Sequence, residues 1–286
     1  MDTQQALITL SKWAQAFSIP PAIIPSNLEQ IEKLTELNLY LANNSATSKP
    51  VTRIPAEIAV LKNLRKLNLS YQELTSTPVE LFQLKNLEEL VLSSNKITTL
   101  PPEIKYLTKL KRLLVDNNNI ATLPIEIGHL VDLEDLDAAD NQLTAIPKQI
   151  SLLNRLRSLR VSSNKIFEMP KEICYLSKLV ELDFSDNQLA NLPNEIGFLS
   201  SLVTLNVGNS HHSEKYRSRH LCNHLTALPE EVCNLIHLRE LLVHDNKIVE
   251  LPSNLASLPY LEGIIADGNP LSVQARLLVQ KINGEY

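Results

Sequence analysis

The stretch LPPEIKYLTKLKRLLVDNNNIATLP (residues 100–124) decides the fold, because its pattern returns along almost the whole chain. The pattern is LPxEIxxLxxLxxLxLxxNxLxx, and its second residue, a proline, recurs every 23 residues in two series. The first series is Pro55, Pro78, Pro101, Pro124, Pro147, Pro170 and Pro193, and the second is Pro229 and Pro252. A fixed period of this length predicts a stack of similar units with one shared core, because a single unit cannot bury its own apolar face.

The recurring positions of the pattern have separate physical roles. In the Leu-x-Leu pair, alternate side chains of a short strand point inward, and about ten such strands are predicted. Their first inward residues are Leu37, Leu67, Leu90, Leu113, Leu136, Leu159, Leu182, Leu205, Leu241 and Ile264. A buried Asn after the strand can satisfy backbone groups of neighbouring turns. This column is Asn95, Asn118, Asn141, Asn164, Asn187, Asn246 and Asn269, and it resumes after an insert at Asn223.

The pattern resembles that of leucine-rich-repeat proteins, in the 23-residue LPxEI form typical of the intracellular class. The resemblance covers nearly the whole chain. It implies an α/β fold, a right-handed superhelical horseshoe arc with a concave parallel β-sheet of about ten strands. Short helical turns are expected on the convex side, and helical caps at both ends. The first two repeats depart from the pattern, with Ala42 and Gln72 in place of the Asn, so we expect looser turns there.

We predict a single domain over residues 1–286. Residues 1–20 are expected to form an N-terminal capping helix, residues 21–269 about ten repeats, and residues 270–286 a C-terminal cap. The period slips at inserts near 42–50 and at 210–222. An amphipathic membrane anchor is the alternative for the first helix, disfavoured because Lys12 is its one basic residue.

Binding is expected on the outward positions of the concave strands, since the leucines fill the core. The acidic candidates on the middle strands are Asp116, Asp135, Asp137, Asp140, Glu181, Asp183 and Asp186. We expect Arg160 to bridge its lateral neighbours Asp137 and Asp183, and the remaining carboxylates to attract a basic protein surface. The candidates toward the two ends are Tyr40, Tyr71, Leu114, Asn206, Asn209, Leu242, His244 and Asp245, with Val91 and Ile265 as further exposed apolar residues. Aromatic residues on such a face are frequent binding anchors, although singly scattered apolar residues are ordinary surface.

Composition argues against several classes of protein. The 286 residues are 44% apolar and carry a formal net charge of −5, whereas nucleic-acid-binding proteins usually show a basic excess. No apolar run approaches the roughly 18–20 residues of a transmembrane helix, and the first residues lack the basic start of a signal peptide. Three widely spaced cysteines make no disulfide framework. We therefore expect a cytoplasmic protein, or one delivered into a host-cell cytoplasm by a secretion system without a cleaved signal.

The insert SHHSEKYRSRHLC (residues 210–222) is the one candidate for chemistry. Its ligand types suit zinc, and they are His211, His212, His220 and Cys222, with His224 and His244 nearby. Their spacing matches no standard zinc pattern. The favoured interpretation is a basic flap beside the acidic strands, whose histidines gain charge between about pH 7 and 6. We predict no catalytic residue, no metal ligand and no cofactor, and we expect Cys174 and Cys233 to lie near solvent.

The resemblance implies a protein-interaction module, and bacterial members of this class include effectors injected into host cells. We predict a non-enzymatic monomer that binds a partner protein with a basic contact surface and acts as a secreted bacterial effector on a host protein. We expect no nucleic-acid partner and no membrane insertion. A cytosolic scaffold or adaptor in the producing cell is the alternative, and a metal-dependent enzyme using the insert is the lower alternative. A fold does not fix a function, so all three hypotheses remain open at this point.

Overall fold

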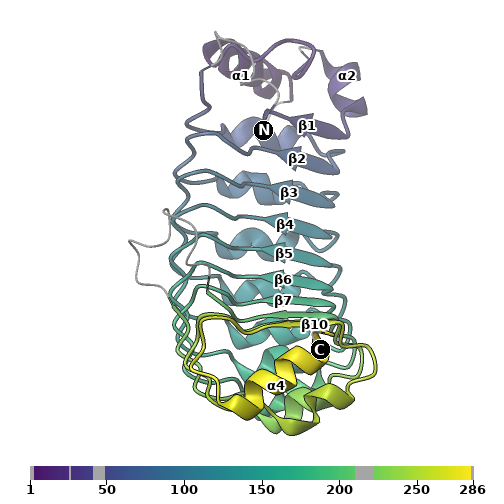
Figure 1. The fold of residues 1–286 in the computed structure, drawn as a ribbon. Coiled ribbons are helices and arrows are strands. Elements are labelled where there is room, and N and C mark those ends of the chain that lie inside the picture. Colours follow the sequence, from purple (N-terminus) through teal and green to yellow (C-terminus); the bar gives the residue numbers. More distant parts are fainter. Residues whose placement is uncertain (1–2, 26, 41–48, 210–221, 285–286) are drawn as a thin grey trace.

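Ten parallel strands form one sheet in sequence order, as seen in a computed structural model that describes residues 3–25, 27–40, 49–209 and 222–284. The strands are β1 (Glu36–Asn38), β2 (Lys66–Asn68), β3 (Glu89–Val91), β4 (Arg112–Leu114), β5 (Asp135–Asp137), β6 (Ser158–Arg160), β7 (Glu181–Asp183), β8 (Thr204–Asn206), β9 (Glu240–Leu242) and β10 (Gly263–Ile265). The first inward leucines pair laterally, for example Leu136 with Leu159. The predicted solenoid, with about ten concave strands, is confirmed (Figure 1).

The helical turns behind the sheet are 3₁₀ helices of five residues each (Figure 1). They are η2 (Ala56–Val60), η3 (Val79–Gln83), η4 (Pro102–Tyr106), η5 (Ile125–His129), η6 (Lys148–Leu152), η7 (Lys171–Tyr175), η8 (Asn194–Phe198), η9 (Glu230–Asn234) and η10 (Ser253–Ser257). In η4, the Ile104 amide donates to the Pro101 carbonyl and the Leu107 amide donates to the Ile104 carbonyl, at 3.1 and 3.0 Å. The proline before each turn has its φ fixed by its ring, so it holds the extended entry from which the turn starts.

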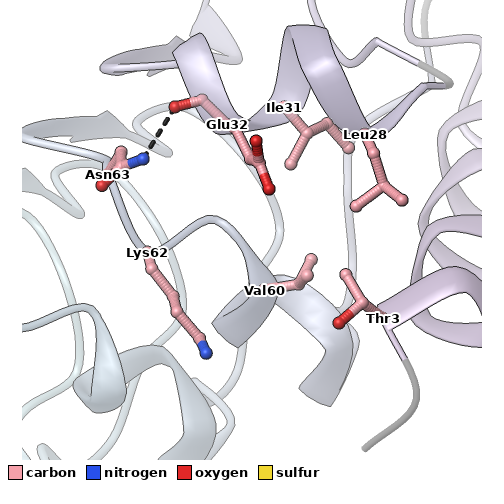
Figure 2. A pocket seen from close by; sticks show the side chains of 7 residues that line it. All are labelled: Thr3, Leu28, Ile31, Glu32, Val60, Lys62 and Asn63. Carbon is pink, nitrogen blue, oxygen red and sulfur yellow. Dashed lines mark hydrogen bonds between the residues drawn. The ribbon is translucent and has the colours of Figure 1, made fainter.

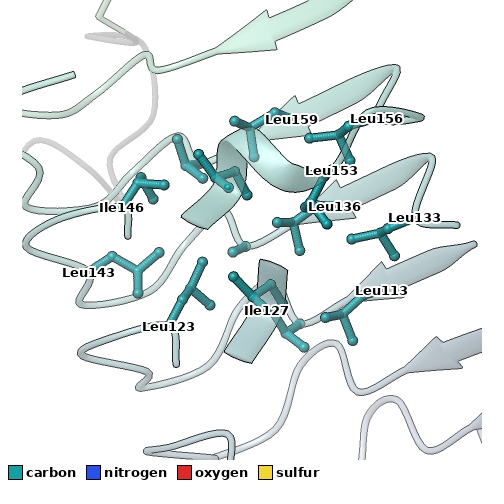
Figure 3. Packing of buried hydrophobic residues seen from close by; sticks show 14 of the residues in the cluster. Leu113, Leu123, Ile127, Leu133, Leu136, Leu143, Ile146, Leu153, Leu156 and Leu159 are labelled. Carbon is teal, nitrogen blue, oxygen red and sulfur yellow. The ribbon is translucent and has the colours of Figure 1, made fainter. Parts of the chain in front are cut away.

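The core lies between the sheet and the 3₁₀ turns. Leu136 from β5, Leu133 just before it and Ile127 from η5 are fully buried, and Figure 3 shows them stacked against the same positions of neighbouring repeats. Burying a side chain of this size stabilises the fold by roughly 1.5–3 kcal/mol. Because each of these side chains packs against the repeats on both sides, it joins neighbouring repeats rather than stabilising one.

The Asn column closes the turns between repeats as the sequence predicts. Asn164 Oδ1 accepts a hydrogen bond from the Leu143 amide at 2.8 Å. Its Nδ2 donates to the carbonyls of Ala138, Val161 and Ser162 at 2.9–3.0 Å. One buried side chain therefore satisfies backbone groups of two adjacent repeats, which removes the cost of burying them unpaired.

Two irregular positions keep this column continuous. The prediction that Asn223 resumes it is confirmed, because Asn223 Oδ1 accepts from the Leu189 amide at 2.9 Å across the insert. The prediction of a looser turn at Gln72 is wrong. Gln72 is buried, accepts from the Val51 amide at 2.8 Å and donates to the Ser70 carbonyl at 3.1 Å, so its longer amide performs the same task. Ala42 lies outside the described residues.

Helices cover both ends of the stack. At the first end lie α1 (Thr3–Ala16) and α2 (Leu28–Lys33). The apolar face of α1, which includes Leu10 and Trp13, is buried in the core, and Trp13 Nε1 donates to the Arg53 carbonyl at 2.8 Å. That face is therefore occupied by the repeats, which removes the apolar surface that a membrane anchor would need. No helix in the described part of the chain is long and apolar enough to cross a membrane.

The last strand is closed by α4 (Val273–Ile282) and the Asn that follows it. Asn283 Oδ1 accepts from the Ile264 amide at 2.9 Å, and its Nδ2 donates to the Ile264 carbonyl at 3.1 Å. One amide side chain thus imitates a neighbouring strand at the outer edge of β10. An open edge is a template for pairing with another chain, so Asn283 blocks that pairing.

Candidate functional site

In five of the ten strands, one column of the concave face stabilises the turn that follows the strand. In β5 and β7, Asp137 and Asp183 accept hydrogen bonds from the backbone amides of Ala139 and Ser185, at 3.0 and 2.9 Å. The same bond to the amide two residues onward is made by Asn38, Asn68 and Asn206. Asp and Asn side chains both stabilise turns in this way, so this bond needs an acceptor and not a charge, and repeats with Val91, Leu114, Leu242 or Ile265 at this position do without it.

Arg160 on β6 joins three carboxylates of the two neighbouring strands. Its guanidinium binds Asp135 and Asp137 of β5 at 2.9 Å each and Glu181 of β7 at 3.0 Å. Ser158 Oγ accepts from Arg160 at 2.8 Å and donates to Glu181 at 2.7 Å. Although partial burial disfavours its charge, the surrounding carboxylates raise the pKa of Arg160 above its ordinary value.

The expected bridge from Arg160 to Asp183 is wrong. Asp183 lies laterally beside Arg160. Its Oδ1 nevertheless accepts from the Ser185 amide at 2.9 Å and from the Ser185 hydroxyl at 2.7 Å. Its short side chain is held by its own turn, whereas the long guanidinium reaches diagonally to Asp135 and Glu181. Ser158 and Ser185 are the site residues that sequence reasoning missed, because a serine carries no distinctive signal.

Two carboxyl groups of the concave face have raised pKa values. Burial raises the pKa of Asp183 above its ordinary value, against hydrogen bonds from Ser185 that lower it. Burial likewise raises the pKa of Asp116, which accepts a hydrogen bond from the Ser93 hydroxyl. Both groups therefore take up a proton at a higher pH than a solvent-exposed aspartate does.

The acidic residues at the turn itself serve the backbone. Asp140, Asp186 and Asp245 have φ values of 51–55°, in the left-handed region that Asp, Asn and Gly tolerate better than other residues. The expectation that Asp186 and Asn209 lie on the binding surface is wrong, because both are buried. The side chain of Asn209 binds the backbone of Asn223, because its Oδ1 accepts a hydrogen bond from the Asn223 amide at 2.7 Å.

The aromatic candidates lie together at the first end of the face. The rings of Tyr40 and Tyr71 have centroids 5.5 Å apart, and the two residues are 40% and 62% exposed. Tyr71 adopts φ 55°, where other repeats place Ser, Asn, Asp or Gly. A bulky residue is disfavoured in this conformation, so the ring is held outward at a conformational cost.

The apolar candidates are less exposed than the sequence suggests. Leu114 and Leu242 are half-buried and Ile265 is exposed. Val91 is buried, so the expectation that it is exposed is wrong. The apolar contribution to the face therefore comes from its two ends rather than from a continuous column.

His244 contacts the backbone of Gly208, as its lateral position predicts. A Cβ on Gly208 would lie 2.3 Å from the His244 ring, so only glycine leaves room for the imidazole there. No group of three or more His, Cys, Asp or Glu side chains in the described ranges is arranged to hold a metal. His211, His212 and His220 lie outside the described residues, and so does the predicted flap.

Cys174 differs from its prediction. It is buried rather than near solvent, and burial raises the pKa of its thiol to about 12. Cys233 is half-buried. A thiol with a raised pKa is a poor nucleophile, so Cys174 fills space in the core.

A pocket of about 470 Å³ opens between α1, α2 and η2 and is shown in Figure 2. Leu28, Ile31 and Val60 form its apolar side, and the Asn63 side chain donates to the Glu32 carbonyl at 2.7 Å. The pocket shares no residue with the concave candidates. It belongs to the capped end and not to the candidate binding surface.

Family comparisons agree with the geometry. A model described as "Leucine-rich repeat region" matches residues 55–161, and one described as "Leucine Rich Repeat" matches residues 178–199. A comparison with curated proteins gave no significant match. Leucine-rich-repeat domains generally mediate protein–protein interaction, and they are generally binding modules rather than enzymes.

Solved structures show the same fold. A leucine-rich-repeat protein of Leptospira interrogans is 28% identical with a TM-score of 0.55, over 88% of this chain and 80% of that chain. The plant peptide hormone receptor RGFR1, in complex with RGF2, is 32% identical with a TM-score of 0.64, over 73% of this chain and 33% of the receptor chain. The ectodomain of the Arabidopsis thaliana receptor kinase GASSHO1/SCHENGEN3 was solved with CASPARIAN STRIP INTEGRITY FACTOR 2. It is 26% identical with a TM-score of 0.64, over 77% of this chain and 29% of that chain.

Proposed function

Starting from a leucine-rich-repeat fold, we propose that this chain binds a protein or peptide with a basic contact surface on its concave face. The contact centres on strands β4–β7 and includes Glu181, Asp183 and Asp116. The tyrosine pair at the first end, Tyr40 and Tyr71, provides the apolar anchor. The relatives solved with peptide partners support a role in binding, and the charge on this face supports the choice of partner.

One observation carries the proposal: where the turn column carries a hydrogen-bond acceptor, three repeats provide it without charge. Asn38, Asn68 and Asn206 make the bond that Asp137 and Asp183 make in the middle strands. The carboxylates at the centre therefore exceed what the fold requires. Partial burial disfavours their charge, so a role outside the fold accounts for keeping them.

The arginines of this face do not cancel its acidity. Across β3–β7, Arg112 and Arg160 face five carboxyl groups, which are Glu89, Asp135, Asp137, Glu181 and Asp183. The ion pairs also order Asp135, Asp137 and Glu181 before any partner arrives. Pre-ordered side chains reduce the entropy cost of binding, and the excess negative charge steers a basic surface toward the face.

We propose further that the partner is a host protein and that the chain acts as a delivered bacterial effector. The LPxEI pattern supports this setting, together with the likeness to the Leptospira interrogans protein. A fusion to a reporter that is active only in host cytosol tests it. Signal that depends on the secretion system is the expected result, and retention in the producing cell would favour a scaffold instead.

The concave site is tested with a lysine- and arginine-rich peptide and a twin that carries glutamate at the same positions. The variant Asp116→Asn/Glu181→Gln/Asp183→Asn removes three charges and keeps each hydrogen-bond acceptor. Exposed charge pairs contribute about 0.5 kcal/mol each, so fluorescence anisotropy should show about a tenfold loss of affinity for the basic peptide.

The matched control removes three carboxylates elsewhere, in Glu32→Gln/Glu80→Gln/Glu250→Gln. This variant has the same net charge but an intact concave face, so its affinity should stay within about twofold of the parent. Equal losses in both variants would mean that net charge alone attracts the peptide. An unchanged affinity in the concave variant would overturn the site.

A further inference from the structure

A second apolar surface lies on the opposite side of the solenoid. The last residue of each 3₁₀ turn from η4 to η8 points into solvent, and these residues are Tyr106, His129, Leu152, Tyr175 and Phe198. We call this column the convex stripe. Its four apolar members are 47%, 52%, 52% and 58% exposed, in chain order. They occupy one position of successive repeats, so they form a line along the solenoid.

The geometry of the 3₁₀ turn places an acidic column beside the stripe. Side chains three residues apart eclipse each other in a 3₁₀ helix. The second residue of a turn therefore lies next to the fifth, as Glu172 does to Tyr175. The same relation pairs Glu103 with Tyr106 and Glu195 with Phe198. Apart from Gln149 in η6, the second residues of η4–η8 are glutamates, so an acidic line runs beside the apolar one.

The fold does not require these apolar residues. At the same position three outer repeats carry the exposed polar residues Gln83, Asn234 and Ser257, and the fourth carries Val60, which packs against the core. Single exposed apolar residues are ordinary, but a contiguous set rimmed by polar residues marks an interaction surface. Here the rings also touch, since the centroids of Tyr175 and Phe198 are 5.8 Å apart. Tyr175 and Phe198 therefore form one apolar surface, and Leu152 and Tyr106 continue its line at the same position of earlier repeats.

The stripe already holds a cation within the chain. Lys105 Nζ lies 5.4 Å from the centroid of the Tyr106 ring, within the range of a cation–π interaction. Two lysines approach the acidic column, Lys148 at 4.0 Å from Glu172 and Lys171 at 3.9 Å from Glu195. Both lysines are well exposed, and such pairs are weak, so basic groups of a partner can replace them.

We propose that the convex stripe binds an amphipathic helix of a partner protein, with apolar residues over the stripe and Lys or Arg along the acidic column. The helical pitch of about 5.4 Å is close to the roughly 4.8 Å spacing that parallel strands impose on the repeats. A helix lying along the solenoid therefore places one turn over each repeat. This goes beyond the concave function, because the chain then holds two partners at once.

The acidic column decides between this occupant and two others. Anionic lipid would meet the row of glutamates and be repelled. A second copy of the chain would bring its own glutamates to the contact, where like charges oppose association. A basic helix is the occupant whose charge complements the column, and its contact does not use the concave strands.

The experiment uses a helical peptide with a leucine seam and lysines along one flank, and a twin with glutamates on that flank. The variant Tyr175→Ser/Phe198→Ser should weaken binding of the lysine peptide about tenfold, as removal of aromatic anchors does. Tyr260→Ser is the control, because Tyr260 is a 53% exposed aromatic residue that follows η10, beyond the end of the stripe. Its affinity should equal that of the parent. Glu172→Gln/Glu195→Gln should weaken binding while leaving the aromatic residues in place.

Several results would overturn the proposal. They are an unchanged affinity in the double serine variant, an equal loss in Tyr260→Ser, and equal binding of the two peptides. Binding to vesicles of anionic lipid, or a dimer of the parent protein that the double serine variant abolishes, would assign the stripe to another occupant. Urea unfolding of each variant confirms that the fold is intact. The concave charge variant should bind the helical peptide normally, so failure here is distinct from failure of the concave site.

Discussion

The concave and convex faces of the same repeats differ in which side chains they expose: one carries paired charges and the other exposed apolar residues. On the concave side, Arg160 holds three carboxylates within 3.0 Å of its guanidinium, so charge is arranged inside the protein. On the convex side, Tyr175 and Phe198 leave more than half of their surface in water. The concave face is therefore ordered but partly neutralised, and the convex stripe is exposed and apolar. We expect salt to weaken binding at the first face more than at the second.

The largest expected effect comes from removing the centre of the concave network. Arg160→Leu leaves Asp135, Asp137 and Glu181 beside one another without their shared guanidinium. We expect the free energy of unfolding in urea to fall by about 2 kcal/mol, since unpairing partly buried charges is costly. The matched variant is Arg155→Leu, which breaks an exposed pair with Asp132 and should cost about 0.5 kcal/mol. Equal losses would show that the concave network has no special role.

The next largest effect is expected from ionic strength, which should weaken peptide binding at the two faces to different extents. Raising salt from about 0.05 to 0.5 M shortens the screening length to a few ångströms. We expect the basic peptide to lose about tenfold in affinity at the concave face and the helical peptide only about threefold at the stripe, because apolar burial is not screened. Anisotropy titrations of both peptides measure this. A steeper salt dependence at the stripe would reverse the comparison.

Asp183→Asn tests the pH dependence of the concave face. Burial raises the folded-state pKa of Asp183 above its unfolded value. The folded state then binds the proton more tightly, so ionised Asp183 lowers stability at neutral pH and the penalty disappears as pH falls. We expect the Asn variant to be more stable than the parent at pH 7 and equal to it near pH 3. A variant that is less stable at pH 7 would show that the charge strengthens the Ser185 hydrogen bonds.

The smallest effect is expected at the turn, where the charge has no binding role. Asp140→Asn should change neither stability nor peptide affinity measurably, because Asn tolerates the left-handed conformation of Asp140. Asp140→Ala should lose about 1 kcal/mol of stability in urea, because Ala does not. A loss of basic-peptide affinity in Asp140→Asn would return this residue to the binding surface.

Spacing alone predicted most of the fold, and the reason is visible at single residues. The inward leucines and the Asn column follow from a 23-residue period, so Asn223 could be placed even after the insert. Gln72 was misjudged because its longer amide side chain still reaches the equivalent backbone groups. The position of a residue in the repeat was sufficient to predict its role where that role is to bury a side chain or to bind the backbone.

The candidate site was less predictable, because the length of each side chain and its local hydrogen bonds decide which residues pair. Lateral register places Arg160 beside Asp183, but a local hydrogen bond to Ser185 competes for that carboxylate. Asp186 and Asn209 are buried, which their repeat position did not reveal. The convex stripe was missed, although a column of Tyr106, Leu152, Tyr175 and Phe198 at multiples of 23 residues was available in the sequence.

Simultaneous occupancy is the sharpest test of whether the two faces are separate binding sites. The protein is saturated with the basic peptide, and the helical peptide is then titrated by anisotropy. Two separate faces predict that the helical peptide binds one to one, with an affinity within about twofold of that for the free protein. Displacement of the first peptide by the second would contradict the account, because both peptides would then share one surface.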